Sequence, residues 1–496
     1  MTSTRHLGRL GETALERLGD RDALFFEGRW HRAAELHERS VRVGGELLAM
    51  GVRPGDRVVV VMANCPEVAI TYGALWRAGA VVVPAIFLLP SPELRHIVVD
   101  SGAVGVVTTA ELLATVQLAV AGLDAWLVCA GATGPGVTEF TELETAAPAD
   151  VVDRADDDAG ALLYTGGTTG RAKGVVLTHG ALWECGRVGY LATHNPDLSR
   201  TIVPLPLAHA FGLMTSIAGS HALEPSSNVL MRWFDPAEFL RLVATHRMER
   251  ATLVPTMLRL LVDQPLEEHD LTSWRLVICG SAPLPLDTVR QIEARLPSLE
   301  ILEGYGLTES GGVACVNRPG QRRLGSVGTP ITEYEARVEA DGELSLRGPG
   351  LMSGYWHDPA ATAAALPDGW LRTGDIGRID DDGYVWVDDR KKDLILRGGF
   401  NVFPRDVEDV LAAHPAVASA GVVGRPDDTL GERVVAFVVL RAGESVTGEE
   451  LSAYALEQLG RHKRVDEVRL VDAIPLTPIG KTDRKRLREL AADLTR

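Results

Sequence analysis

The sequence has few cysteines and no long apolar run. Its five cysteines are scattered without a Cys-x-x-Cys pair, which argues against a disulfide framework or a zinc site and indicates reduced thiols. No stretch reaches the roughly 18 apolar residues that a transmembrane helix needs. The first residues also lack the apolar core of a signal peptide. We therefore expect a cytoplasmic protein without a membrane span.

Positive charge is also scarce. The 496 residues contain 50 lysines and arginines against 67 aspartates and glutamates, which gives a formal net charge of −17. This balance disfavours nucleic acid or an anionic membrane surface as the main partner. The hydrophobic content is 46%, and the length exceeds one ordinary core, so we expect two or more structural units.

The order of apolar runs predicts the fold class. Runs such as 56–62 and 79–83 do not alternate with polar residues, and helical periodicity over 66–78 separates them, which indicates parallel sheets covered by helices on both faces. Residues 10–50 also show helical periodicity. After about residue 325 the strands alternate and turn at glycine and aspartate, as antiparallel strands do.

These patterns predict an α/β protein with a large and a small domain. The large N-terminal domain, residues 1–392, consists of layered α/β subdomains plus a β-rich part. The small C-terminal domain, residues 393–496, is α+β, and the boundary falls in the charged stretch 388–393.

A loop of glycines and hydroxyls at residues 164–174 is the strongest single motif. Glycine lets the backbone approach an anion closely, and Lys173 adds a point charge. The loop is not a Walker motif, because Lys173 is followed by glycine and an apolar run instead of Ser/Thr and a helix. It therefore indicates a triphosphate-binding hairpin, with an ordinary flexible hairpin as the alternative.

Five other segments carry groups suited to phosphate, ribose or a carboxylate, although each also fits an ordinary turn, a solvated charge run or a buried histidine. In chain order they are Pro204–Leu213 with His209, Gly304–Glu309, Thr373–Asp375, Asp389–Asn401 and Pro478–Lys481. Glu309 supplies the hard oxygen that Mg²⁺ prefers. The conjunction and order of these segments carry the functional prediction.

Together the motifs resemble those of the adenylate-forming superfamily, and most of all acyl-CoA synthetases, over residues 20 to 490. The resemblance implies that ATP activates a carboxylic acid as its acyl-adenylate, with Mg²⁺, and that CoA then displaces AMP. It implies catalytic roles for Lys481, Thr308, Glu309 and His209, with Glu309 as the Mg²⁺ ligand. It implies that the small domain is mobile and rotates about a hinge at Lys392.

The resemblance also implies which residues bind ATP and CoA. The phosphate loop comprises Thr165, Gly166, Gly167, Thr168, Thr169, Gly170 and Lys173. Around adenine and ribose it implies Gly280, Ser281, Ala282, Glu303, Gly304, Tyr305, Gly306, Asp375 and Arg390. Gly398, Gly399 and Phe400 would shape the CoA tunnel.

The acid should bind near His209, Phe211, Gly212, Gly304, Gly311 and Gly312. These positions are small or apolar, and none is an arginine or aspartate that would pair with a second charge. We therefore expect an apolar monocarboxylic acid, fatty or bulky and cyclic, with aryl acids still open. The acceptor thiol, CoA or a separate carrier protein, and a homodimer also stay open.

Two departures from the family pattern widen the alternatives. Gly166 and Ala172 stand where the phosphate loop commonly has serine and proline, so the chain could mainly convert a preformed acyl-adenylate into a thioester. Arg397 stands where relatives often have a small or apolar residue, and it would meet a CoA phosphate or be solvated. A luciferase-like oxidase and a non-catalytic nucleotide-binding module share the fold and remain the alternatives from other classes.

Overall fold

The computed structural model describes residues 5–165, 172–460, 463–477 and 482–492. The described chain divides into two compact units, residues 1–336 with 346–372, and residues 337–345 with 373–496. Among the described residues, no helix combines the length and apolar character required to cross a bilayer. The predicted α/β class, with a large sheet-and-helix part and a smaller C-terminal α+β part, is confirmed.

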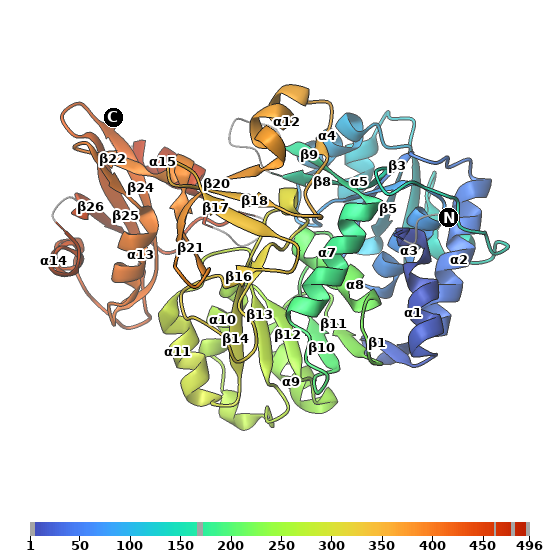
Figure 1. The fold of residues 1–496 in the computed structure, drawn as a ribbon, viewed down its shortest axis with the longest axis horizontal. Helices are drawn as coiled ribbons and strands as arrows, with labels where there is room; N and C mark the ends of the chain where they lie inside the picture. Colours follow the sequence, from blue (N-terminus) through green and yellow to red (C-terminus); the bar gives the residue numbers. More distant parts are fainter. Residues whose placement is uncertain (1–4, 166–171, 461–462, 478–481, 493–496) are drawn as a thin grey trace. The chain divides into compact units, whose positions relative to one another are not determined.

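Unit 1 contains two large sheets (Figure 1). The first runs, in spatial order, β19 (Gly354–Tyr355), β9 (Lys173–Thr178), β8 (Ala159–Thr165), β4 (Val81–Pro84), β3 (Arg57–Val61), β5 (Gly105–Thr109), β6 (Trp126–Ala130) and β7 (Thr138–Glu139). Its central strands are parallel, and Val58, Val59 and Val60 on β3 are at most 1% exposed. Continuous valine runs form such strands because helices cover both faces.

The second sheet holds the elements around which the candidate acid site is built. Its spatial order is β16 (Thr329–Pro330), β15 (Cys315–Val316), β14 (Glu300–Tyr305), β13 (Leu276–Cys279), β12 (Arg250–Leu253), β10 (Arg200–Val203), β11 (Ser227–Leu230), β1 (Asp22–Phe26) and β2 (Arg29–Arg32). Strands β14, β13, β12, β10 and β11 are parallel, so their carboxyl ends lie at one edge.

The helices of unit 1 begin at recognisable signals. Thr178 caps α7 by accepting a hydrogen bond from Ala181 N at 3.1 Å, and Asp235 with Pro236 starts α9. Helices α7 and α8 pack against each other near the middle of the unit (Figure 1). The helices are α1 (Leu10–Leu18), α2 (Ala33–Ala49), α3 (Pro66–Arg77), α4 (Ser91–Ser101), α5 (Leu113–Val120), α6 (Phe140–Leu143), α7 (His179–Ala192), α8 (Ala210–Ser220), α9 (Pro236–His246), α10 (Pro255–Val262), α11 (Leu286–Arg295) and α12 (Pro359–Ala365).

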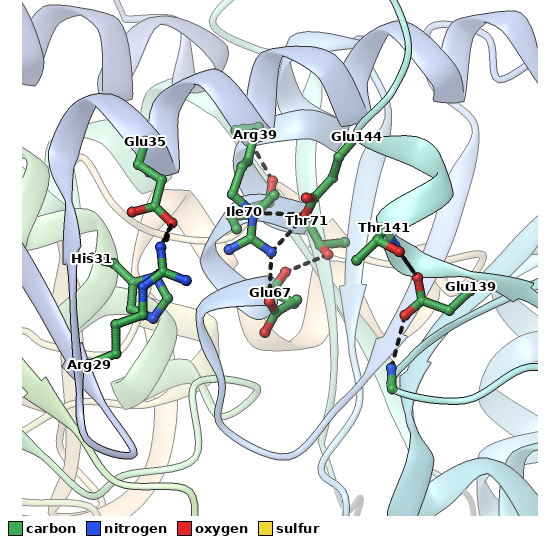
Figure 2. Close-up of polar contacts among 12 residues, drawn as sticks. Arg29, His31, Glu35, Arg39, Glu67, Ile70, Thr71, Glu139, Thr141 and Glu144 are labelled. Atoms are coloured by element: carbon green, nitrogen blue, oxygen red, sulfur yellow. Dashed lines mark hydrogen bonds and ion pairs between the residues drawn. The ribbon is translucent and has the colours of Figure 1, made fainter.

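An arginine ties three of these helices together. Arg39 on α2 contacts Glu67 on α3 at 2.7 Å and Glu144, just after α6, at 2.8 Å (Figure 2). Burial by itself would raise the pKa of Glu67, but the contact with Arg39 outweighs burial and holds that pKa below its usual value. This ion-pair network fixes how α2 and α3 pack.

The helical periodicity expected over residues 10–50 is wrong in its middle part. Between α1 and α2 the chain forms the hairpin β1–β2, which turns at Glu27 and Gly28, both with positive φ. Phe25 and Trp30 pack against the core of the second sheet, and β1 pairs with β11. Pairing with a strand some 200 residues away overrides the local periodicity.

Unit 2 holds most of a sheet of β17 (Glu335–Val338), β18 (Glu343–Arg347), β20 (Leu371–Ile379) and β21 (Val385–Arg390). A further sheet runs β23 (Phe400–Val402), β22 (Ile395–Arg397), β25 (Gly431–Leu440) and β24 (Val417–Asp427), with β26 (Glu467–Leu470) beside β25. Its helices are α13 (Pro404–Ala412), α14 (Gly448–Gln458) and α15 (Arg484–Ala492). The boundary between the two compact units falls near residue 372. The boundary at 392/393 between an N-terminal domain and a mobile C-terminal domain stays a prediction.

Candidate functional site

The glycine-rich loop lies on a hairpin, as its flanking apolar runs predict. Strands β8 and β9 are antiparallel, and Thr165 pairs directly with Lys173 across the loop. Gly166, Gly167, Thr168, Thr169 and Gly170 lie outside the described residues. At the end of the loop, the Ala172 carbonyl lies 3.0 Å from His96 Nε2.

Lys173 connects this hairpin to Glu309. Its ammonium lies 2.9 Å from Asp358 Oδ2 and 5.4 Å from the centre of the Tyr355 ring. The Tyr355 hydroxyl donates to Glu309 Oε1 at 3.0 Å. Two of the predicted phosphate-handling groups, a cation and a carboxylate, therefore both lie near one tyrosine, the cation over its ring and the carboxylate at its hydroxyl.

The carboxyl ends of β13 and β14 form the predicted adenine segment. Gly280 follows β13, and Glu303, Gly304 and Tyr305 end β14. The two chains run so close that a Cβ on Gly280 would lie 2.9 Å from the Gly304 carbonyl oxygen. Ser281 has a φ of +73°, the left-handed conformation that turns the chain toward Ala282. A flat, side-chain-free edge of this kind suits an aromatic base.

A tight turn after Gly306 positions Thr308 and Glu309. Gly311 N donates to the Thr308 carbonyl at 3.0 Å, and Met352 N donates to the Glu309 carbonyl at 2.8 Å. Inside the turn, Ser310 Oγ accepts from Leu307 N at 2.9 Å. These bonds hold the backbone around Glu309 in one conformation, so the side chain that carries its carboxylate extends from a fixed point.

A cavity of about 140 Å³ lies between the second sheet and helices α7 and α8. Of the predicted acid-binding residues, Phe211, Gly304 and Gly312 line it, and so do Gly280, Ser281, Tyr305 and Gly306. Glu303 does not line it and is buried at the end of β14.

His209, Gly212 and Gly311 do not line this cavity. His209 caps α8, where its Nδ1 accepts from Phe211 N at 3.3 Å. A Cβ on Gly212 would overlap the Pro206 carbonyl, and one on Gly311 would overlap Cys185 Sγ. Both glycines therefore allow close packing of neighbouring segments. That they face the acid stays a prediction.

The cavity extends beyond the positions considered from the sequence, where charged side chains line it. Its wall includes Arg250 and Glu224. Glu224 is bonded to His194 Nε2 at 2.9 Å and to the Tyr190 hydroxyl at 3.2 Å, and the His194 contact is the main reason that its pKa lies below the usual value. Arg250 donates to Thr193 Oγ1 at 3.0 Å, and burial lowers the pKa of its guanidinium.

The predicted ribose-binding pair lies in unit 2. Asp375 on β20 and Arg390 on β21 are direct cross-strand neighbours, and Arg390 Nε lies 2.8 Å from Asp375 Oδ1. Asp375 is 3% exposed. The Gly374 amide, at a φ of +71°, donates to Glu343 Oε1 at 2.8 Å. The hairpin thus holds an aspartate and an arginine in one fixed pair.

The hinge and CoA segments lie in the same unit. Burial lowers the pKa of Lys392, and the next residue, Asp393, is paired with Arg488. Gly398 and Gly399, both with positive φ, form the two-residue turn between β22 and β23, and Phe400 is 59% exposed.

Arg397, for which a CoA phosphate or solvent was expected as the partner, is instead bound to Asp466 Oδ1 at 2.7 Å. Its side chain is 15% exposed, so the solvated alternative is wrong. Lys481 lies outside the described residues.

Two residues of the candidate site, Tyr355 and Arg250, carry no signal in the sequence. Tyr355 lies on β19, which pairs with β9 and so reaches both Lys173 and Glu309 from far along the chain. Arg250 starts a short strand whose neighbours come from residues 200–203 and 276–279. No local motif marks either residue. Only strand order and register reveal them.

Comparisons with known proteins agree with this architecture. A model of AMP-binding enzymes matches residues 11–356, and a model of the AMP-binding enzyme C-terminal domain matches residues 406–481. A feruloyl-CoA synthase of Amycolatopsis sp is 37% identical over 462 residues, covering 90% of this chain and 91% of that protein. A long-chain-fatty-acid–CoA ligase of Bacillus subtilis (strain 168) is 31% identical, covering 95% and 92%.

Among solved structures, the anthranilate CoA ligase AuaEII in complex with anthranoyl-AMP has a TM-score of 0.92 at 25% identity, covering 99% of this chain and 98% of that one. The family match spans most of both units, and the relatives form acyl-CoA thioesters. The chain therefore belongs to the AMP-binding enzymes of the adenylate-forming superfamily, and it is an AMP-forming acid–thiol ligase that uses ATP and CoA.

Proposed function

We infer that the chain is an acyl-CoA synthetase for a bulky, ring-bearing carboxylic acid. The observation that carries this proposal is the cavity of about 140 Å³, which begins at Gly280 and Gly304 and passes Phe211. An engineered cavity of about 150 Å³ is known to accept benzene, so a volume of this size suits a ring.

The names of the relatives do not distinguish a ring-bearing acid from a long-chain acid as the substrate, because one relative is a feruloyl-CoA synthase and another is a long-chain-fatty-acid–CoA ligase. The walls of this cavity favour the ring. Phe211 presents a flat ring and Met214 and Val313 add apolar surface, while Gly304 and Gly312 leave room beside them. Offset stacking on a phenyl ring adds to the area that an aromatic or fused-ring acid buries.

In the proposed first step, a carboxylate oxygen attacks the α-phosphorus of ATP, and the bond to the β-phosphate oxygen breaks to release pyrophosphate. Lys173 would neutralise the outer phosphates, and Thr308 would donate to the α-phosphate. Lys481 would reduce the repulsion between carboxylate and phosphate. Such contacts accelerate the step because they stabilise charge that develops in the transition state.

Glu309 fits the role of a Mg²⁺ ligand. Mg²⁺ is usually held by one or two carboxylates together with substrate phosphates and water. Glu309 Oε1 accepts from the Tyr355 hydroxyl at 3.0 Å, and the Lys173 ammonium lies over the same ring, 5.4 Å from its centre. Among the described residues no cluster of three acidic, histidine or cysteine side chains could hold a metal, so a bound Mg²⁺ would depend on the phosphates of ATP.

In the proposed second step, the CoA thiolate attacks the acyl carbonyl and AMP leaves. Asp375 and Arg390 would hold the ribose hydroxyls, and the turn Gly398–Phe400 would shape the path of CoA. Rotation of the C-terminal domain about Lys392 stays a prediction. His209, as the cap of α8, would act by holding Phe211 in place.

The test is carboxylate-dependent exchange of pyrophosphate into ATP across ring-bearing and straight-chain acids, followed by thioester detection with CoA. Exchange and thioester formation with ring-bearing acids support the proposal. Equal rates with long-chain fatty acids would contradict the choice of a ring.

Three other outcomes would favour the alternatives. Thioester formed only from supplied acyl-adenylates would mean that Gly166 and Ala172 have disabled the first step. Oxygen-dependent light emission from an adenylate would favour a luciferase-like oxidase. Faster thioester formation with a carrier protein than with CoA would change the proposed acceptor thiol and leave the proposed adenylation step as it is.

A further inference from the structure

The cavity has a polar end at the amino ends of the strands. Thr201 on β10 is the register partner of both Asn228 on β11 and Arg250 on β12. These three residues sit in one row across adjacent strands, and all three line the cavity. Side chains at the same level of parallel neighbours share a face, so the row forms one polar wall.

This wall is far from the end where the carboxyl group is proposed to react. Arg250 pairs with Leu276, and Leu253 pairs with Cys279, the residue before Gly280. The row therefore lies about four residue steps from Gly280, which is about 13 Å along the sheet. Thr252 and Ile278, which are register partners, line the wall between the two ends.

Arg250 is a cation that has unused donors as far as the described residues go. A guanidinium carries five N–H donors. Within the part of the chain that the structure describes, its side chain makes one hydrogen bond, to Thr193 Oγ1 at 3.0 Å. It forms no ion pair with a described carboxylate.

The two carboxylates nearby are engaged elsewhere. Glu249, the preceding residue on the chain, is bound to Arg200 at 2.9 Å and accepts from the Ser199 and Arg200 amides. Glu224, on the cavity wall, is bound to His194 and Tyr190. A half-buried arginine without an acidic partner is costly, and an oxygen acceptor on a ligand would remove that cost.

We propose that Arg250, with Thr201 and Asn228, binds an oxygen-bearing group on the end of the acid remote from its reacting carboxyl group. The substrate class is then a ring-bearing acid with a remote hydroxyl, oxo or carboxylate oxygen. This inference rests on the proposed acyl-CoA synthetase function and specifies its substrate. Arg250 is a specificity-determining residue, because it touches the acid and takes no part in bond making.

Three acids of one shape test the proposal: cinnamate, 4-hydroxycinnamate and 4-carboxycinnamate. For the wild-type enzyme we expect kcat/KM with at least one oxygen-bearing acid to exceed that with cinnamate by about tenfold or more, as a hydrogen bond to a charged donor provides. Preference for the 4-carboxy acid would identify an anion as the preferred group, and preference for the 4-hydroxy acid a neutral oxygen.

The variant Arg250→Met should erase this preference. Its kcat/KM with cinnamate should stay within about threefold of wild type, while its advantage with the oxygen-bearing acids falls to less than about twofold. Arg250→Lys should retain part of the preference for the 4-carboxy acid, since lysine keeps the positive charge but lacks the planar pair of N–H donors that a guanidinium presents to a carboxylate. Arg241→Met, an exposed arginine on α9, is the matched control and should behave as wild type.

Titration calorimetry of the three acids without ATP separates the failure of this inference from the failure of the proposed function. Binding that depends on Arg250, without any turnover, would overturn the synthetase proposal and keep the recognition site. Turnover with equal kcat/KM for the three acids, or an equal loss for all of them in Arg250→Met, would overturn the recognition site alone. Neither binding nor turnover of any acid would overturn both.

Discussion

Replacing Asp358 by asparagine should improve the apparent affinity for ATP. The Asp358 carboxylate lies 2.9 Å from the Lys173 ammonium, and the contact holds the pKa of Asp358 below its usual value. If Lys173 binds the outer phosphates of ATP, each binding event must exchange this carboxylate for phosphate oxygens. Asp358→Asn removes the competing charge, and the amide oxygen can still accept from Ala361 N, which caps α12.

The structure sets the size of the effect. Both side chains of the pair are 36% exposed, so water and salt screen the contact and its net strength is small. We expect KM for ATP to fall by about two- to fivefold, with kcat nearly unchanged. The ratio should shrink as ionic strength rises.

The assay is initial-rate thioester formation with ATP varied, at two salt concentrations. Asp263→Asn, which removes the same charge from an exposed ion pair on the surface, is the control and should leave KM for ATP unchanged. In a Lys173→Met background, which by itself should slow exchange by on the order of 10²-fold, Asp358→Asn should have no further effect. A rise in KM for ATP in Asp358→Asn would refute the reasoning, because it would show that Asp358 holds Lys173 in its productive position.

Three further predictions concern other contacts. Tyr355→Phe keeps the ring beneath Lys173 but removes the hydrogen bond to Glu309, and we expect kcat/KM for Mg²⁺–ATP to fall about tenfold in the exchange assay. Arg39→Met leaves Glu67 unpaired among helices, which should cost about 2–3 kcal/mol in urea unfolding at pH 7. Because the folded pKa of Glu67 lies below its unfolded value, this stabilisation is full above about pH 4.3 and is lost as pH falls through the folded pKa, so the difference in stability between the two proteins should shrink as the solution is acidified. Gly311→Ala should destabilise by about 2 kcal/mol without altering acid preference, and Cys185→Ala should relieve part of that loss, as thermal unfolding would show.

Features set by local chemistry were predictable from the sequence. The valine run on β3 forms a fully buried parallel strand, and the apolar flanks of the phosphate loop pair as a hairpin. The antiparallel strands expected around the glycine and aspartate turn also form, and they place Asp375 opposite Arg390. In each case the residues that determine the structure are close in the chain.

Features set by long-range register were not predictable. Arg250, Thr201 and Asn228 form one row only because three short strands pair in a particular order. Arg397 binds Asp466, a partner 69 residues away, and the sequence around neither residue predicts this ion pair. The hairpin β1–β2 likewise depends on β11. Local periodicity contains no information on which distant segments become neighbours.

The same register explains why one family of motifs is compatible with many acids. Gly280 and Gly304 stand at the carboxyl ends of β13 and β14, where adenylation is proposed to occur, and the chemistry there requires small residues. The amino ends of the strands carry no such requirement, because they are about 13 Å away from the reacting carboxyl group. Substitution at Arg250 can therefore change which acid fits while leaving the phosphate-handling residues untouched. A specificity determinant of this kind has to be sought by strand register, at the ends of the strands opposite to the conspicuous motifs.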